Sequence, residues 1–161
     1  MTALELLREK GVVTQRALVE HVAGEPVRGS WWSHPKGKAI FAAGVAIEES
    51  GEAVACKLFE GRSAWVHRRL WPALARVVTD PGWRAERVAR LTPEARALLE
   101  RVEAEGEVRN PPKEPRAELE ATMLVHVTSE HEGRHVAVLR PWSLGPPLDG
   151  SLADAWAQLR A

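Results

Sequence analysis

Apolar and polar side chains alternate along residues 53–68, AVACKLFEGRSAWVHR, on either side of Glu60-Gly61. Alternation with a period of two is typical of a strand with one buried face, and a two-residue loop that contains glycine favours a hairpin turn. The stretch therefore predicts two antiparallel strands joined at Glu60-Gly61. The expected cross-strand pairs are Phe59 with Arg62 and Cys56 with Trp65.

Three helices are expected before this hairpin, over residues 2–10, 14–24 and 35–51. Thr14 is placed to cap the second of them, because its hydroxyl can accept a backbone N–H of the first turn. In the third helix the residues expected to face inward are Ile40, Phe41, Val45 and Ile47. Three helices followed by a hairpin resemble the order of elements in winged-helix modules. The sequence therefore predicts an α+β fold with a winged-helix-like module over residues 1–80.

A strong turn signal, Asp80-Pro81-Gly82, separates this part from residues 81–161. The second part is expected to form a helix-plus-hairpin module, either packed as a second unit or belonging to the same compact domain. Its expected elements are helices over residues 92–106 and 115–123, a hairpin over residues 124–139 around Glu132-Gly133, and a terminal helix capped by Ser151. Glu60-Gly61-Arg62 and Glu132-Gly133-Arg134 take matching places in the two hairpins, which leaves an internal repeat open.

The composition is that of an ordinary globular protein, with 161 residues, 45% hydrophobic and 27% charged. The single cysteine, Cys56, has no partner for an internal disulfide, and residues 1–22 lack the continuous apolar run of a signal peptide or membrane span. A cytoplasmic protein without membrane contact is therefore expected. The net charge is zero, but residues 1–90 hold 14 basic and 10 acidic side chains, against 8 and 12 in residues 91–161. This asymmetry allows the first part to meet a polyanion.

The most distinctive surface candidate lies between Arg28 and Lys38, where cations alternate with indole rings. The side chains singled out there are Trp31, Trp32, His34, Lys36 and Lys38. Cations can bind phosphate while aromatic rings stack on unpaired bases, so the segment predicts a nucleic-acid contact. The alternative is that the two tryptophans anchor an irregular loop to the core and the lysines are merely solvated.

A second group of cations belongs to the first hairpin and its end: Arg62, His67, Arg68 and Arg69. Guanidinium groups match two phosphate oxygens at once, so these residues could make the hairpin a nucleic-acid-binding wing. They could equally face water without a special role.

Histidines gather in the second hairpin at positions 126, 131 and 135. With a turn at Glu132-Gly133, the side chains of His126, Glu130 and His135 are expected to share one face. They suggest a small hydrolase or a metal site, although the spacing matches no strong zinc motif and exposed strand polarity explains them as well. The chain has no phosphate-binding loop, dinucleotide fingerprint or nucleophile elbow, so neither an enzyme nor a cofactor is expected.

Two unusual runs, Gly29-Ser30-Trp31-Trp32-Ser33-His34-Pro35 and VHRRLWPAL at residues 66–74, resemble a family of uncharacterised bacterial proteins. The resemblance implies a bacterial origin and brings no reaction or substrate. The leading hypothesis is accordingly a nucleic-acid-binding protein of winged-helix type, with DNA as the expected partner, acting in regulation or repair. The alternatives are a protein-interaction or scaffold module, with a protein partner or a second copy, and the small hydrolase.

Overall fold

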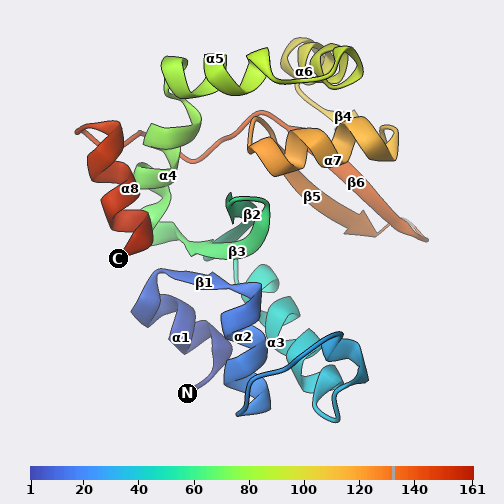
Figure 1. The fold of residues 1–161 in the computed structure, drawn as a ribbon, viewed down its shortest axis with the longest axis vertical. Coiled ribbons are helices and arrows are strands. Elements are labelled where there is room, and N and C mark those ends of the chain that lie inside the picture. Colours follow the sequence, from blue (N-terminus) through green and yellow to red (C-terminus); the bar gives the residue numbers. More distant parts are fainter. Residues whose placement is uncertain (132) are drawn as a thin grey trace.

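The computed structural model describes residues 1–131 and 133–161, and it shows an α+β fold with two small antiparallel sheets (Figure 1). The first sheet and its helices occupy one end of the molecule, and the second sheet and its helices occupy the other. In both sheets the strand that comes third along the chain lies in the centre, with order β1-β3-β2 and order β4-β6-β5. The predicted α+β class is therefore confirmed.

The first sheet belongs to a unit of three helices, two of which flank a short strand. Its elements are α1 (Ala3–Lys10), β1 (Val12–Thr14), α2 (Gln15–Ala23), the 3-10 turn η1 (Trp31–Ser33), α3 (Gly37–Glu49), β2 (Ala53–Phe59) and β3 (Arg62–His67). Thr14 caps α2 as predicted, because its side chain accepts the N–H of Ala17 at 3.1 Å. The sequence did not predict β1, which is only three residues long and pairs with β3.

The first hairpin forms where it was predicted, with positive φ angles at Glu60 and Gly61, as a two-residue primed turn requires. The pair Phe59–Arg62 is confirmed. The predicted pair of Cys56 with Trp65 is wrong, because the register shifts between Cys56 and Phe59 and Cys56 faces Ala64 instead. An irregularity of this kind adds a residue to one strand, and simple alternation cannot reveal it.

Helix α3 buries a narrower stripe than predicted. Ile40 and Ile47 are buried, since residues seven apart lie on the same side of a helix. Phe41 was expected to face inward and instead is 52% exposed. It follows Ile40 directly and is therefore turned by about 100° around the helix axis, away from the core.

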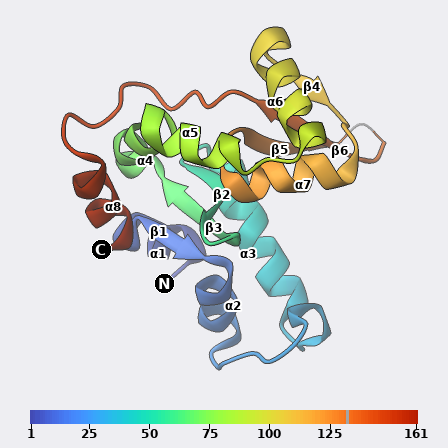
Figure 2. The same ribbon diagram turned by 45° about the horizontal axis from the view of Figure 1, so that its top comes forward.

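A third layer covers the far side of the first sheet. It consists of η2 (Arg68–Leu70), α4 (Trp71–Val78) and the terminal helix α8 (Leu152–Arg160), which lies beside α4 (Figure 2). Ser151 caps α8 as predicted. Residues of β3, α4 and α8 form one buried cluster: Ala64, Val66, Leu74, Val77, Ala155 and Leu159 are among its members. The end of the chain thus completes the core of the first sheet.

The second sheet packs under its own helices. The elements are α5 (Pro81–Ala89), α6 (Pro93–Glu105), β4 (Val108–Arg109), α7 (Lys113–Thr122), β5 (His126–His131) and β6 (His135–Arg140). The sequence predicted a turn and a junction at residues 80–82, and in the structure these residues also begin α5. The Asp80 side chain accepts the N–H of Trp83 at 2.8 Å, and Pro81 occupies the first turn of the helix. The boundary at residue 80 and the internal repeat stay predictions. Glu132, on which the second hairpin triplet depends, lies outside the described residues.

Within the described ranges no helix has the length and apolar content needed to cross a bilayer.

Candidate functional site

Three aromatic rings gather at the start of α3. The rings of Trp31 and Trp32 stack with centroids 4.1 Å apart, and the ring of Trp32 lies 5.4 Å from that of Phe41. Trp32 is 63% exposed, whereas Trp31 is partly buried against α2 and α3. Each of the two interpretations of this segment therefore applies to one ring. Trp31 anchors the loop to the core, and Trp32 faces solvent, where it could contact a partner. We call Trp31, Trp32 and Phe41 the aromatic patch.

Local contacts fix the loop that carries the patch. His34 accepts the N–H of Lys36 at Nδ1 (3.1 Å), and its Nε2 lies 2.9 Å from a carboxylate oxygen of Glu25. Gly37 leaves room for the turn: a Cβ there would lie 3.0 Å from the carbonyl oxygen of Trp32. His34, a predicted contact residue, therefore has a structural role in this loop.

Three exposed cations accompany the patch: Arg28, Lys36 and Lys38. Among the described residues none of the three has a carboxylate within ion-pair distance. Lys36 is the cap of α3 and Lys38 is its second residue, so both stand at the positive end of the helix dipole. Because the dipole disfavours cations at this end, the charges do not serve helix stability, and together with the helix end they favour a bound anion.

A narrow groove of about 190 Å³ runs beside the patch, between α2 and α3. Its apolar part includes Leu18 and the aromatic patch, and its polar groups are Gln15 and Glu48. A carboxylate oxygen of Glu48 lies 3.4 Å from the indole Nε1 of Trp65, which donates to it. The groove therefore joins stacking surface to hydrogen-bonding groups.

The second predicted group of cations does not join this surface as a set. His67 is buried, and its Nε2 lies 3.1 Å from Glu52. The guanidinium of Arg69 donates to the carbonyl oxygens of Arg8 and Glu9 at 3.3 and 3.1 Å, at the end of α1.

Arg68 lies 3.9 Å from Glu52, and Arg62 is exposed at the hairpin turn. The 13 residues of α3 separate the Lys36 end from the Glu52 end by roughly 20 Å at 1.5 Å per residue. Of the nine predicted contact residues, the structure thus gathers Trp31, Trp32, His34, Lys36 and Lys38. It places His67, Arg68 and Arg69 in a different contact network.

Glu52 is the centre of that network. It is 8% exposed and accepts hydrogen bonds from Arg8 at 3.0 Å and from His67. These hydrogen bonds hold the pKa of Glu52 down to about 2. The network joins the end of α1 to β3 and gives these charged residues a structural role.

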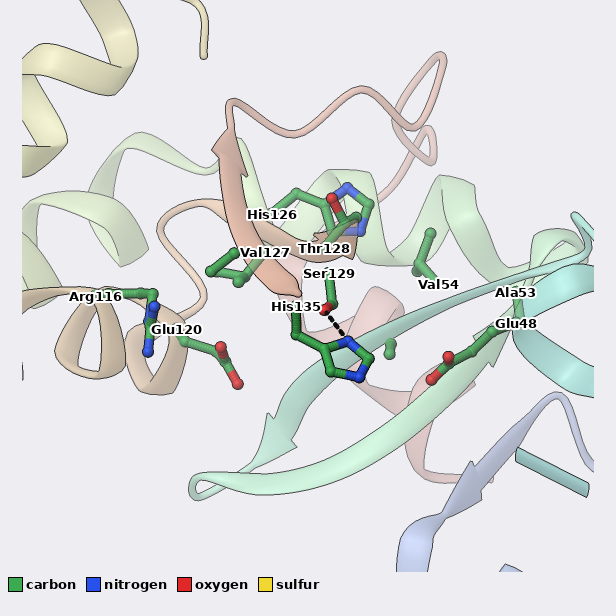
Figure 3. Close-up of a pocket in the computed structure, with 12 residues that line it drawn as sticks. Glu48, Ala53, Val54, Arg116, Glu120, His126, Val127, Thr128, Ser129 and His135 are labelled. Carbon is green, nitrogen blue, oxygen red and sulfur yellow. Dashed lines mark hydrogen bonds between the residues drawn. The ribbon is translucent and has the colours of Figure 1, made fainter. Parts of the chain in front are cut away.

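A cleft of about 600 Å³ separates the two sheets, and it contains two of the predicted histidines (Figure 3). Nδ1 of His135 lies 3.3 Å from the hydroxyl of Ser129, and the ring of His126 stacks on Trp142 at 4.6 Å. Burial lowers the pKa of His126, so its neutral form is favoured. His135 belongs to β6, the central strand, and lies on the face that lines the cleft with Ser129 and Ala137. His126 lies on the opposite face and reaches the cleft because β5 is the edge strand of its sheet.

The histidine cluster does not form as predicted. The register pairs His131 with His135 and Glu130 with Val136, so His135 lies on the opposite face from His126 and Glu130. Glu130 is engaged instead by Arg109 at 2.8 Å and by Arg140 at 3.0 Å. In the part of the chain that the structure describes, no three His, Cys, Asp or Glu side chains converge as metal ligands would.

Cys56 is partly buried between the sheets, and burial raises the pKa of its thiol to about 12. A nucleophilic cysteine requires the opposite shift. Its environment is therefore that of an apolar side chain.

Sequence reasoning missed Phe41 and Glu48 as surface residues of the site. The available signal was the seven-residue spacing of Ile40 and Ile47, which fixes the buried stripe and turns Phe41 and Glu48 outward.

Comparison of the chain with protein-family models, with curated proteins and with solved structures gave no match. The resemblance drawn from the tryptophan-containing runs stays a prediction, and the argument for function depends on the site alone.

Proposed function

We propose that the chain is a nucleic-acid-binding protein of winged-helix type, and that the aromatic patch with its neighbouring cations is the contact surface. The order of elements in the first unit supports the fold assignment: helix, short strand, two helices and a hairpin, with β1 paired to the second hairpin strand β3. The second unit has the same strand order, as expected for two related modules packed together. Fold alone does not assign a function, so the site carries the proposal.

The observation that carries it is the joint exposure of Trp32 and Phe41 beside cations without acidic partners among the described residues. Large exposed aromatic side chains add little to the stability of an isolated chain. A stacked base gains about 1–3 kcal/mol on such a ring, and each phosphate contact adds a salt-dependent contribution. Aromatic rings beside cations at one helix end therefore form a surface suited to nucleic acid.

The test is fluorescence anisotropy with labelled oligonucleotides over a series of salt concentrations. We expect binding at low salt, and affinity that falls as salt rises because cations are released from the phosphates. Replacing Lys36 and Lys38 together by alanine should weaken binding and lower the slope of log affinity against log salt by roughly 1–2.

The matched control is Lys113→Ala, which removes an exposed lysine at the start of α7 in the other unit. It should leave both affinity and slope unchanged. Absence of binding at low salt, or an equal effect of the Lys113 variant, would refute the proposal.

A second candidate is a protein-interaction module, favoured by an open groove of about 610 Å³ on the other side of α3. Alanines line its α3 wall, and Leu4 and Val22 line the opposite wall. A helix of a second copy could lie there, because small side chains permit close approach. Light scattering tests this alternative: a dimer that Ala42→Glu converts to monomer supports it, and a monomeric wild type excludes self-association through this groove.

A further inference from the structure

The groove beside the aromatic patch has the dimensions of a site for one small planar group. Its volume of about 190 Å³ is below the roughly 300–1,000 Å³ of pockets for drug-sized ligands. Trp31, Trp32 and Phe41 supply ring surfaces at one end, and Glu48 and Trp65 lie at the other. A flat, partly apolar ligand with a polar edge fits this distribution of groups.

The exposed side of α3 is poorly suited to the major groove of a duplex. Between Lys38 and Glu48 the exposed residues of α3 are Phe41 beside the groove and Ala39, Ala42 and Ala46 on the other side, and none of them is polar. A helix in the major groove uses polar side chains to contact base edges and cations to contact both backbones. Glu48 and Glu49 are exposed at the end of α3, where a helix laid along the groove would bring them toward phosphates.

Both observations lead to one class of nucleic acid. We infer that the groove binds an unpaired base of a single strand, an inference that rests on the proposed function. The base stacks against the ring of Trp32, and the neighbouring phosphates lie near Lys36 and Lys38 at the positive end of α3. A base inside a duplex cannot do this, because its faces are covered by the adjacent base pairs.

The groove also determines which bases are preferred. Glu48 is the carboxylate of the groove lining, and an ionised carboxylate accepts hydrogen bonds but cannot donate them. Cytosine and adenine carry an exocyclic amino group that donates, whereas thymine presents a carbonyl oxygen at the corresponding position. The site therefore favours cytosine or adenine over thymine.

The experiment compares labelled oligo-dC, labelled oligo-dT and a duplex of mixed sequence at low salt. The wild type should bind oligo-dC more tightly than oligo-dT. Trp32→Ala should weaken binding of the single strands by roughly 5–150-fold, the equivalent of one lost base stack. Because Trp32 is exposed, its removal should leave the melting temperature nearly unchanged, and this confirms that the variant is folded.

The preference itself is tested by Glu48→Gln, with Glu49→Gln as the matched control. Both variants remove one negative charge from exposed neighbours on α3, so any general gain in affinity is shared. Glu49 does not line the groove. Only Glu48→Gln should reduce the ratio of oligo-dC to oligo-dT affinity.

The outcomes separate this inference from the proposed function. No binding of any oligonucleotide overturns both. Duplex binding that exceeds single-strand binding, or single-strand binding that Trp32→Ala does not weaken, leaves the proposed function standing and overturns the inference. Equal affinity for oligo-dC and oligo-dT, or an unchanged ratio in Glu48→Gln, overturns the role of Glu48.

Discussion

Replacing Leu159 by alanine should show that the last helix is an integral part of the first sheet's core. Leu159 is 1% exposed and belongs to the buried cluster that joins α8 to α4 and β3. Fully buried leucines cost about 2.7–5 kcal/mol when cut to alanine, because transfer free energy is lost and a cavity remains. A terminal helix can shift to fill part of that cavity, so we expect the lower end, about 3 kcal/mol.

In a chain of this size each kcal/mol lowers the melting temperature by about 2–4 °C, so the expected decrease is about 6–12 °C. Thermal unfolding followed by far-UV circular dichroism measures it. Gln158→Ala is the matched control. Gln158 precedes Leu159 on the same helix and is exposed, so its replacement should change the free energy of unfolding by less than about 0.5 kcal/mol. If the two variants melt together, α8 is not packed as described and the argument is refuted.

Three further changes test other contacts. Glu52→Gln should lower the melting temperature at neutral pH. The pKa of Glu52 in the folded protein is about 2, below its ordinary value of 4.5, so the stabilising effect of the carboxylate is lost as pH falls from 4.5 toward 2. The difference in melting temperature between variant and wild type should therefore shrink over that interval, and a constant difference contradicts the argument. Cys56 should react with iodoacetamide far more slowly in the native protein than in the urea-unfolded protein, because burial raises the pKa of its thiol to about 12. Mass spectrometry measures the two rates, and equal rates would show that Cys56 is not buried. Gly37→Ala should lower stability by about 1–3 kcal/mol in urea unfolding, whereas Gly82→Ala, whose Cβ would approach nothing closer than 3.5 Å, should not.

Local rules predicted much of the secondary structure. Thr14 and Ser151 cap helices as expected, because a cap is decided by the hydroxyl and the N–H groups that follow within three residues. The turn at Glu60-Gly61 is local in the same way. The short strands β1 and β4 could not be predicted, since two or three residues carry no periodic pattern and are defined by partners far along the chain.

The candidate site was predicted only where its residues are close in sequence. The Trp31 to Lys38 segment contains its own aromatic rings and cations, so its character was visible. Arg69 was predicted to contact phosphate, but its guanidinium binds the carbonyl oxygens of Arg8 and Glu9. The sequence does not reveal this contact, because these two residues lie about 60 positions earlier in the chain. The face occupied by His135 depends on a register that a shift of one residue reverses.

The packing of α8 against α4 also has a consequence for biosynthesis. Residues 12–67 can pair their strands as soon as they leave the ribosome, but the side of that sheet covered by α8 stays open until residue 159 has been made. The nascent chain therefore carries an apolar surface through the synthesis of residues 68–159, an interval in which such surfaces are prone to aggregate. Completion of this buried cluster therefore waits for the synthesis of α8.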